Sequence, residues 1–176
     1  MTAARQVIAY LGVGSNIDPE TNLIAALDRL RRVVRVTGVS TVYRTAPLGR
    51  PEQASYLNGV WRIETGLGAR PLKYDVLRPL ESALGRVRTA DRDAARTIDL
   101  DVLLYGDLVV DEPGLKLPDP ALGERVFLAV PLLELAPDLV LPGTNEPLRA
   151  VVRRLPSGGL VPVHKFTGRL RALLGG

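Results

Sequence analysis

Apolar and polar residues alternate along the chain with two different periods, which predicts a mixture of strands and helices. Residues 7–13 form a short apolar run, as expected of a buried strand. Residues 20–34 repeat apolar side chains at helical spacing and predict an amphipathic helix packed on a sheet. A β-rich stretch covers 34–45, and residues 56–64 alternate between an apolar and a polar face, as a strand does.

The pattern continues with a second helix and a further strand. The helix is expected over 71–84, where Pro79 should kink it or divide it in two. The strand alternates at period two, with Ile98, Leu100, Val102 and Leu104 on one face and Thr97, Asp99 and Asp101 on the other. The resulting order, β-α-β-β-α-β, predicts a ferredoxin-like α+β fold with a mainly antiparallel sheet, helices packed on it and C-terminal additions.

Length and composition fit one globular domain. The 176 residues, 46% hydrophobic and 24% charged, predict one domain over residues 1–160 and a C-terminal tail, 161–176, with no assigned function. The absence of cysteine excludes disulfides and thiolate metal sites, and the single histidine, His164, cannot build a histidine metal site or a serine triad. Apolar runs are too short for a membrane span and no secretory signal is found, so we expect a cytoplasmic protein without a membrane partner.

Arginines and aspartates gather in one segment of the chain. Four arginines precede the aspartate pair of the last predicted strand: Arg86, Arg88, Arg92 and Arg96. Asp99 and Asp101 should project side by side, and two neighbouring carboxylates on an apolar strand are costly without a cation. Mg²⁺ takes one or two carboxylates together with water and phosphate, and guanidinium groups suit phosphate oxygens. The segment therefore predicts a phosphoryl-transfer site, the alternative being a solvated surface loop.

A second candidate region precedes the strand at 56–64. Residues 46–55 contain two prolines and a glycine and must form a loop longer than a hairpin needs, which is often a sign of function. In the strand, Tyr56 and Asn58 share the polar face, which could bind a flat ligand or simply face solvent. Trp61 lies on the apolar face and is assigned to the core.

Four blocks of the sequence, in order, carry a family resemblance. The segment GRVRTADRDAARTIDLDVLLY (85–105) resembles the signature of the 6-hydroxymethyl-7,8-dihydropterin pyrophosphokinases of folate biosynthesis. Three further blocks are similar to the family: IAYLGVGSNI (8–17), YRTAPLGRPEQASYLNGV (43–60) and LPDPALGERVFLAVPLLELAP (117–137). The resemblance implies the ferredoxin-like fold and transfer of pyrophosphate from ATP to the hydroxymethyl group of a reduced pterin.

The resemblance also implies roles for individual residues. Catalytic roles fall to Arg86 and Arg96. Metal binding falls to Asp99 and Asp101, which would hold two Mg²⁺ ions. Nucleotide binding falls to Glu81, Arg86, Arg88, Arg92, Arg96, Ile98 and Arg125. Pterin binding falls to Thr45, Pro47, Leu48, Tyr56, Asn58 and Phe127. For Glu81, a helix-surface position is the competing interpretation.

The chain departs from the family pattern at two positions. Asp93 stands where the family usually has a tryptophan, and Asp119 where it has a histidine. We expect these carboxylates to point away from the site or to engage Arg88, Arg92 or a metal; the remaining alternative is weakened catalysis. Two other functions stay open: a pterin- or nucleotide-binding protein without catalysis, and a nucleic-acid-binding module, which the net charge of +4 would suit. The expected partners are ATP and a reduced pterin, without nucleic acid.

Overall fold

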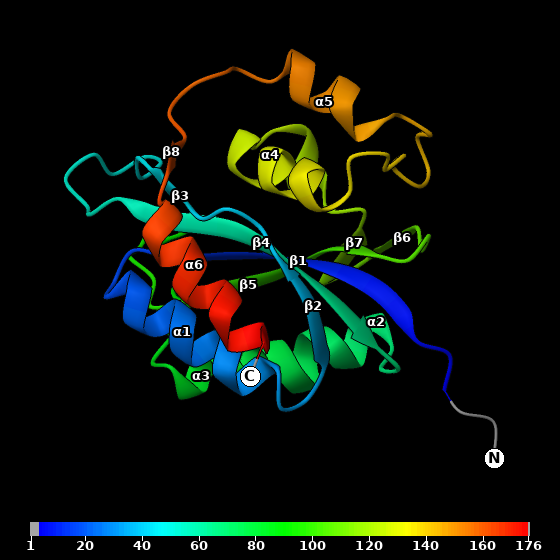
Figure 1. Cartoon of the computed structure of the whole chain (residues 1–176), viewed down its shortest axis with the longest axis horizontal. Helices are drawn as coiled ribbons and strands as arrows, with labels where there is room; N and C mark the ends of the chain where they lie inside the picture. The colour runs from blue at the N-terminus through cyan, green and yellow to red at the C-terminus, as the bar shows by residue number, and fades with distance from the viewer. Residues whose placement is uncertain (1–3, 176) are drawn as a thin grey trace.

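A six-stranded antiparallel sheet forms the centre of the molecule in the computed structural model, which describes residues 4–175 (Figure 1). The strand order is β5-β1-β4-β3-β8, and β2 also pairs with β4. The strands are β1 (Val7–Ser15), β2 (Arg35–Val39), β3 (Tyr43–Thr45), β4 (Tyr56–Thr65), β5 (Asp99–Tyr105) and β8 (Val161–Pro162). A separate hairpin is formed by β6 (Val110–Glu112) and β7 (Leu115–Leu117).

Helices cover both faces of this sheet (Figure 1). One face carries α1 (Pro19–Leu30), α2 (Ala69–Pro71), α3 (Arg78–Ala83) and α6 (His164–Ala172). The other carries α4 (Val126–Leu135) and α5 (Leu148–Arg154). Each face has its own apolar core: Leu27, Trp61 and Phe166 belong to the first, and Leu103, Ala129 and Leu148 to the second. Trp61 is fully buried, as its position on the apolar face of the strand predicted.

The element order confirms the predicted ferredoxin-like α+β fold. The core runs β1-α1-(β2, β3)-β4-α3-β5, where β2 and β3 both pair with β4 and together occupy the place of one strand. The interruption between them lies at Ser40, whose side-chain oxygen accepts a hydrogen bond from the backbone N–H of Val60 at 2.9 Å. The backbone N–H of Ser40 in turn donates to the Val60 carbonyl at 2.9 Å, so Ser40 stays paired with β4 through one backbone and one side-chain hydrogen bond.

Both predicted helices form, with one difference in each. The first begins at Pro19 and ends at Leu30, four residues before the predicted end. Asp18 occupies its N-cap with a left-handed backbone (φ 41°) but makes no side-chain cap hydrogen bond. In the second, Pro79 lies in the first turn of α3, directly after a π-helical segment, Leu72–Leu77. The backbone stays helical from Ala69 to Ala83, so the proline does not split the helix; a π-helical stretch, in which the Arg78 N–H donates to the Lys73 carbonyl, precedes it instead.

The prediction that Leu104 shares a face with Ile98, Leu100 and Val102 is wrong. A β-bulge shifts the pairing of β1 with β5, so that Tyr10 pairs with Leu104 while the adjacent Leu11 pairs with Val102. The extra residue turns the strand over, and Leu104 packs in the second core while the other three pack in the first. Period two holds over residues 98–102, the part of the strand that carries the aspartates.

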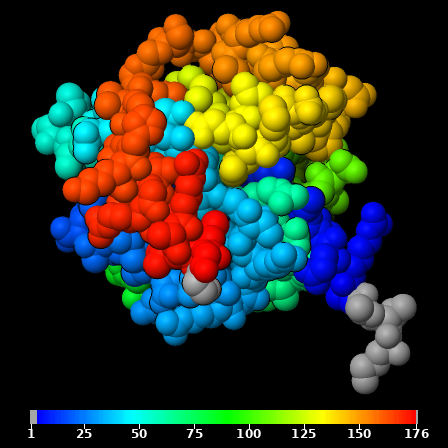
Figure 2. Space-filling view, viewed as in Figure 1, coloured from blue at the N-terminus to red at the C-terminus, as the bar shows by residue number. Residues whose placement is uncertain are grey.

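The C-terminal residues pack on the sheet. Strand β8 pairs with β3, and the Thr167 hydroxyl accepts a hydrogen bond from the Val42 N–H at 2.9 Å. Phe166 and Leu170 are buried in the first core, and Figure 2 shows this segment lying against the N-terminal part of the chain. The domain boundary at residue 160 stays a prediction. No helix among residues 4–175 is long and apolar enough to cross a membrane, and a cytoplasmic location also stays a prediction.

Candidate active site

Two cavities meet at Asp101 on β5. The larger cavity, of about 370 Å³, is lined by residues of β1, β4 and β5, by the two long loops, and by the start of α4. The smaller cavity, of about 320 Å³, lies between β5, the π-helical segment and the β6–β7 hairpin. Asp101 is the one residue that lines both. The predicted metal-binding residue therefore stands at the junction of two separate binding spaces.

The aspartates of β5 face a strand that leaves room beside them. Asp99 pairs with Gly14 of β1 and Asp101 with Gly12, so no side chain of β1 covers either carboxylate. Burial, followed by the charges of Asp99 and Asp119, raises the pKa of Asp101 to about 7. The charges of Arg78 and Lys73 lower this pKa but do not offset the burial.

The donor set of these aspartates fits Mg²⁺. Both donors are carboxylates, and Mg²⁺ needs only one or two such ligands when phosphate and water complete its coordination. Within residues 4–175 no group of three or more His, Cys, Asp or Glu side chains could hold a metal ion by itself. A metal bound here would therefore depend on a phosphate ligand as well as on the protein.

Arg96 is held in place from several directions. Its guanidinium Nη1 lies 2.5 Å from Oδ2 of Asp99, and Nη2 donates to the carbonyl of Arg92. Its backbone N–H donates to Oδ1 of Asn16 at 2.7 Å, and its carbonyl accepts the Asn16 N–H at 3.0 Å. The charge of Arg96 is thereby placed beside the aspartates at the wall of the larger cavity.

The other predicted arginines divide into two groups. Arg92 and Arg125 line the larger cavity with Arg96, whereas Arg86 and Arg88 line neither cavity. Within the described residues, Nε of Arg86 is buried and has no hydrogen-bond partner. This side chain therefore retains an unused donor close to the site.

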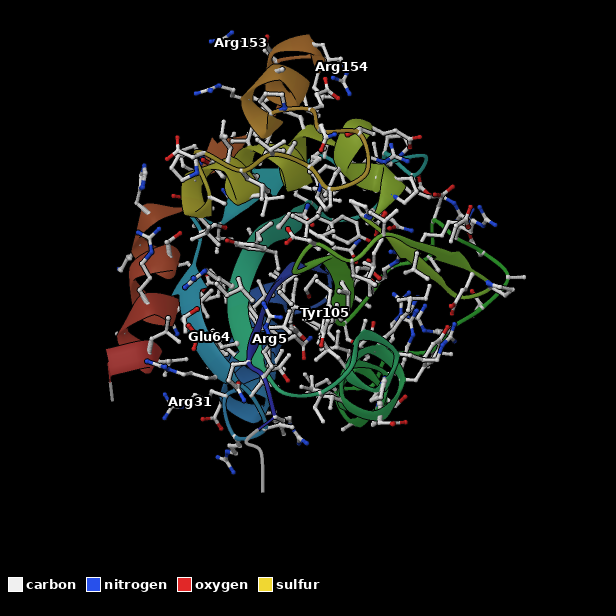
Figure 3. All side chains as sticks on the ribbon, turned by 90° about the vertical axis from the view of Figure 1, so that its right-hand side faces the viewer. Arg5, Arg31, Glu64, Tyr105, Arg153 and Arg154 are labelled. Carbon is white, nitrogen blue, oxygen red and sulfur yellow. The ribbon has the colours of Figure 1, made fainter. Side chains whose placement is uncertain are left out.

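Arginines outside this segment are dispersed over the surface. Figure 3 places Arg153 and Arg154, the last two residues of α5, at the opposite end of the molecule from Arg5 and Arg31. All four are exposed. The excess positive charge thus includes residues at both ends of the molecule as well as those at the cavity.

Glu81 is not the helix-surface residue of the competing interpretation. Its side chain is 1% exposed, and its Oε1 accepts hydrogen bonds from Arg78 and Arg88, each at 2.9 Å. Burial is the main cause that raises its pKa to about 7, and the charge of Asp99 adds to it. In this structure Glu81 anchors Arg88 beneath the strand; its contact with a nucleotide stays a prediction.

Most of the residues that the resemblance assigns to pterin binding lie together in the larger cavity, although their binding of pterin stays a prediction. Tyr56, Asn58, Thr45, Leu48 and Phe127 all line it, whereas Pro47 does not. The Asn58 amide donates to the Thr45 hydroxyl at 2.7 Å, which fixes the orientation of its carbonyl. The Ile98 side chain is fully buried in the first core, so any contact of this residue with a nucleotide would have to use its main chain.

Gly14, the next-to-last residue of β1, lies where the backbone and the Asn58 side chain approach closely. A Cβ atom at this position would lie 2.5 Å from Oδ1 of Asn58, too close for any side chain. The residue keeps an extended strand conformation, so the requirement is for close approach and not for an unusual dihedral angle. The Asn58 oxygen can lie over β1 only because this position has no side chain.

The two long loops contact one another above the larger cavity. Arg50 forms an ion pair with Asp91, and Nε2 of Gln53 donates to the Asp93 carbonyl at 2.8 Å. The Asn16 amide in turn donates to Oε1 of Gln53 at 3.1 Å. The loop over residues 46–55 is therefore tied to the arginine-bearing loop and to the end of β1.

The expectation that Asp93 and Asp119 point away from the site is wrong. Asp93 lines the larger cavity and lies against Gly49, while Asp119 lines the smaller cavity. Asp119 accepts a hydrogen bond from the Ala121 N–H at 2.9 Å and caps the 3₁₀ turn Pro120–Gly123; burial raises its pKa. Within residues 4–175 neither carboxylate forms an ion pair with Arg88 or Arg92, so that expectation is also wrong, whereas engagement of a metal stays a prediction.

Sequence reasoning missed two residues of the smaller cavity, Lys73 and Lys116. They come from the π-helical segment and from β7, elements that no motif joins. A signal was nevertheless present, because the chain contains only three lysines and two of them are these.

Comparisons with known proteins identify the family of this chain. A model of the 7,8-dihydro-6-hydroxymethylpterin-pyrophosphokinase (HPPK) family matches residues 10–137. Two proteins named 2-amino-4-hydroxy-6-hydroxymethyldihydropteridine pyrophosphokinase are each 41% identical to this chain. The one from Methylorubrum extorquens matches over 159 residues, 89% of this chain and 98% of the relative, and the one from Pseudomonas aeruginosa over 136 residues, 76% and 83%.

Longer proteins also contain this unit. The folic acid synthesis protein fol1 of Schizosaccharomyces pombe is 40% identical over 170 residues, which are 95% of this chain but only 23% of fol1. A crystal structure of Plasmodium falciparum HPPK-DHPS with pteroate aligns with a TM-score of 0.68 at 11% identity, over 88% of this chain and 43% of that one, and supports the fold alone. The family match and the relatives of similar length confirm the resemblance seen in the four sequence blocks: the chain belongs to the 7,8-dihydro-6-hydroxymethylpterin-pyrophosphokinase family.

Proposed function

We propose that this chain transfers the diphosphate of ATP to the hydroxymethyl group of 6-hydroxymethyl-7,8-dihydropterin, with the pterin in the larger cavity and the nucleotide in the smaller one. Membership of the family makes the chain an ATP-dependent diphosphotransferase of folate biosynthesis. The observation that carries the assignment of the site is the position of Asp101, which borders both cavities beside Asp99. The triphosphate and the pterin hydroxyl would meet there.

The larger cavity suits a flat heterocycle with polar edges. Tyr56, Phe127 and Leu48 supply apolar surface for the ring faces. The Asn58 amide, oriented by Thr45, supplies polar atoms at the ring edge without needing to reorganise. A pre-positioned amide contributes more to binding affinity than a mobile one, because less conformational entropy is lost when the ligand binds.

The polar wall of the larger cavity suits the transferred phosphates. Arg92, Arg96 and Arg125 line it, and guanidinium groups match phosphate oxygens in charge and geometry. Arg86 brings its unpartnered Nε close to the same region. Arg88 is bound to Glu81 and would have to exchange that carboxylate for a phosphate in order to bind the nucleotide.

Asp99 and Asp101 would hold Mg²⁺, which neutralises charge on the triphosphate and aligns it. In the transfer, a bond forms between the pterin hydroxymethyl oxygen and the β-phosphorus while the bond from that phosphorus to the α–β bridging oxygen breaks. AMP leaves with the bridging oxygen, and the hydroxyl proton is released. Arg96 and Arg86 would offset the negative charge that grows on these oxygens. Positioning and charge stabilisation are sufficient for phosphoryl transfer, so a strong general base is not required.

Release of AMP tests this proposal directly. The purified chain, given ATP, Mg²⁺ and 6-hydroxymethyl-7,8-dihydropterin, should form AMP and the pterin diphosphate in equal amounts. Omission of the pterin should abolish AMP formation, which separates transfer from simple hydrolysis. A chain that binds both ligands in calorimetry but forms no AMP would be a binding protein, and the catalytic part of the proposal would be wrong.

A further inference from the structure

The smaller cavity differs from the rest of the chain in the basic residue that it uses. The chain has 20 arginines but only three lysines, at positions 73, 116 and 165. Lys73 and Lys116 both line this cavity. A lysine carries its charge as a compact group on a flexible stem, unlike the rigid fork of arginine, and so can change partner when a ligand enters. The two lysines therefore mark this cavity as a place where positive charge must move.

Lys73 has a contact that it can leave at little cost. Its Nζ donates to the Gly114 carbonyl at 2.6 Å, but the Tyr74 hydroxyl donates to the same oxygen at 2.8 Å. Gly114 has a φ of +77°, and a Cβ atom there would collide with that hydroxyl, so Tyr74 packs tightly on the turn. The carbonyl thus remains hydrogen-bonded when the ammonium of Lys73 departs.

The carboxylates of the smaller cavity give a nearby lysine a favourable role when a polyphosphate binds. Asp101 and Asp119 both line it, and the charge of Lys73 acts on both carboxylates. A polyphosphate entering this space would be repelled by two carboxylates unless positive charge came with it or was already present. Lys116 is less suited to this task, because its side chain is 61% exposed and already lies 3.7 Å from Asp111.

We propose that Lys73 is a nucleotide-binding residue: its ammonium leaves the Gly114 carbonyl and binds a phosphate oxygen of the nucleotide, with Lys116 contributing a weaker attraction from the rim of the cavity. This inference rests on the proposed function, which places the nucleotide in the smaller cavity. The proposed role of Lys73 also explains how the nucleotide can bind beside Asp119. The carboxylate of Asp119 repels phosphate, and Lys73 supplies positive charge nearby.

Calorimetry on the full chain with Mg²⁺ and a non-hydrolysable ATP analogue measures how much each lysine contributes to nucleotide affinity. Lys73→Met should weaken nucleotide affinity about tenfold, as expected for one hydrogen bond to a charged group, and Lys73→Arg should restore most of it. Lys116→Met should weaken affinity about twofold, as expected for an exposed pair. Lys165→Met, on α6, is the matched control and should change nothing. Unchanged affinity in Lys73→Met, or a larger loss in Lys116→Met, overturns the proposal.

A purely structural role for Lys73 predicts a different result. In that case Lys73→Met would lower the melting temperature and weaken pterin and nucleotide to the same extent. We expect instead that pterin affinity changes less than twofold while the KM for ATP rises more than kcat falls, as is typical of a binding residue. Equal weakening of both ligands would overturn the assignment.

Chemical protection in the unmodified chain separates this inference from the proposed function. An N-hydroxysuccinimide ester acylates the three lysines, and mass spectrometry of peptides gives the rate at each. The Mg²⁺–ATP analogue should slow acylation of Lys73 about tenfold relative to Lys165. If the chain forms AMP but Lys73 reacts equally fast with and without nucleotide, this inference alone is wrong. If the chain forms no AMP although Lys73 is protected, the proposed catalysis is wrong and nucleotide binding at Lys73 stands.

Discussion

The two cavities that meet at Asp101 are built in opposite ways. In the larger one the polar groups are fixed before any ligand arrives: Asn58 is bound to Thr45, and Arg96 is bound to Asp99 and to the end of β1. In the smaller one the positively charged groups are lysines on flexible stems, whose present partners are a turn carbonyl and an exposed aspartate. The first arrangement suits a rigid ring with a fixed pattern of edges; the second suits a flexible polyanion.

This difference has a consequence for the energetics of the two ligands. A fixed site loses little conformational entropy on binding and discriminates strongly, because a ligand with the wrong edge leaves buried polar groups unpaired. A site of mobile charges discriminates weakly and depends on ionic strength. Substitutions in the larger cavity should therefore change affinity or rate sharply, whereas those in the smaller cavity or in the exposed loops should have graded, salt-dependent effects.

The largest effect is expected at the residue that the two cavities share. Asp101→Asn should lower turnover about 1,000-fold or more, because it removes a charged ligand of the metal that stabilises the transferred phosphates. The fold should persist, since asparagine has nearly the same volume. Turnover is measured as AMP release over a range of Mg²⁺ concentrations, with circular dichroism as the check on folding.

A neighbouring aspartate provides the control for this substitution. Asp107 is exposed in the turn directly after β5, and Asp107→Asn should leave turnover unchanged. Asp99→Asn should also nearly abolish turnover, because Asp99 is the second carboxylate of the pair. Near-normal activity of either β5 variant at limiting Mg²⁺ would show that the metal assignment is wrong.

The second prediction separates transition-state stabilisation from binding in the larger cavity. Arg96→Ala should lower kcat about 100-fold, the loss typical of removing one charge-stabilising donor. Nucleotide affinity should fall much less, because Arg92 and Arg125 remain at the cavity wall. Single-turnover rates and calorimetric affinities measure the two effects.

Arg44 on β3 is exposed and supplies a matched arginine for this comparison. Arg44→Ala should leave both kcat and nucleotide affinity unchanged. Equal losses of kcat and affinity in Arg96→Ala would make Arg96 a binding residue without a special role in the transition state.

Local pattern was sufficient to predict most of the fold. Period two and period 3.6 gave the order of strands and helices, and the alternation at 98–102 placed Asp99 and Asp101 on one surface. It failed at Leu104, because a β-bulge depends on how β5 pairs with β1 and leaves no trace in the apolar pattern. The burial of Glu81 beneath the strand is likewise set by tertiary packing and not by helical spacing.

The site was predictable where a motif covered it and unpredictable where distant segments meet. The segment 85–105 indicated that Arg92, Arg96, Asp99 and Asp101 lie together, as the larger cavity confirms, because their chemistry and spacing lie in one stretch; their metal and phosphate roles stay predictions. Lys73 contacts Gly114 in the β6–β7 hairpin, 41 positions further along the chain. Arg50 and Asp91, which form an ion pair, are also 41 positions apart. No local pattern encodes such contacts. The composition alone gave a hint, since lysine is so rare in this chain.

A third prediction tests whether pterin binding requires the Asn58 amide to keep its present orientation in the larger cavity. Gly14→Ala places a methyl group where Oδ1 of Asn58 now lies, 2.5 Å from the ideal Cβ position, and so must displace the amide. Pterin affinity should fall about tenfold, the value of one well-placed hydrogen bond to a polar ligand edge. Nucleotide affinity should not change. Calorimetry or pterin fluorescence gives both values.

Gly168 in α6 offers a control for this substitution, because nothing lies within 4 Å of the Cβ that it would gain. Gly168→Ala should leave both affinities unchanged and raise the free energy of unfolding by about 0.5–1 kcal/mol, since alanine favours a helix. Unchanged pterin affinity in Gly14→Ala would show that the Asn58 amide does not recognise the ligand.

The smallest effect is expected at the ion pair that joins the two loops above the larger cavity. Arg50 and Asp91 have side chains that are 43% and 42% exposed, and such pairs contribute at most about 1 kcal/mol. Arg50→Met should therefore raise the KM for pterin only about twofold at low salt, because the loops over 46–55 and 86–96 cover the cavity less of the time. The increase should vanish at about 1 M salt, where exposed charges are screened in the unmodified chain as well.

Arg169, which pairs with Glu20 on the surface at similar exposure, is the control, and Arg169→Met should leave this KM unchanged at every salt concentration. A KM in Arg50→Met equal to that of the unmodified chain at low salt would mean that Gln53 and Asn16 hold the loops without help from the ion pair. A twofold rise that persists in high salt would instead mean that the stem of Arg50 acts by packing, and the electrostatic explanation would be wrong.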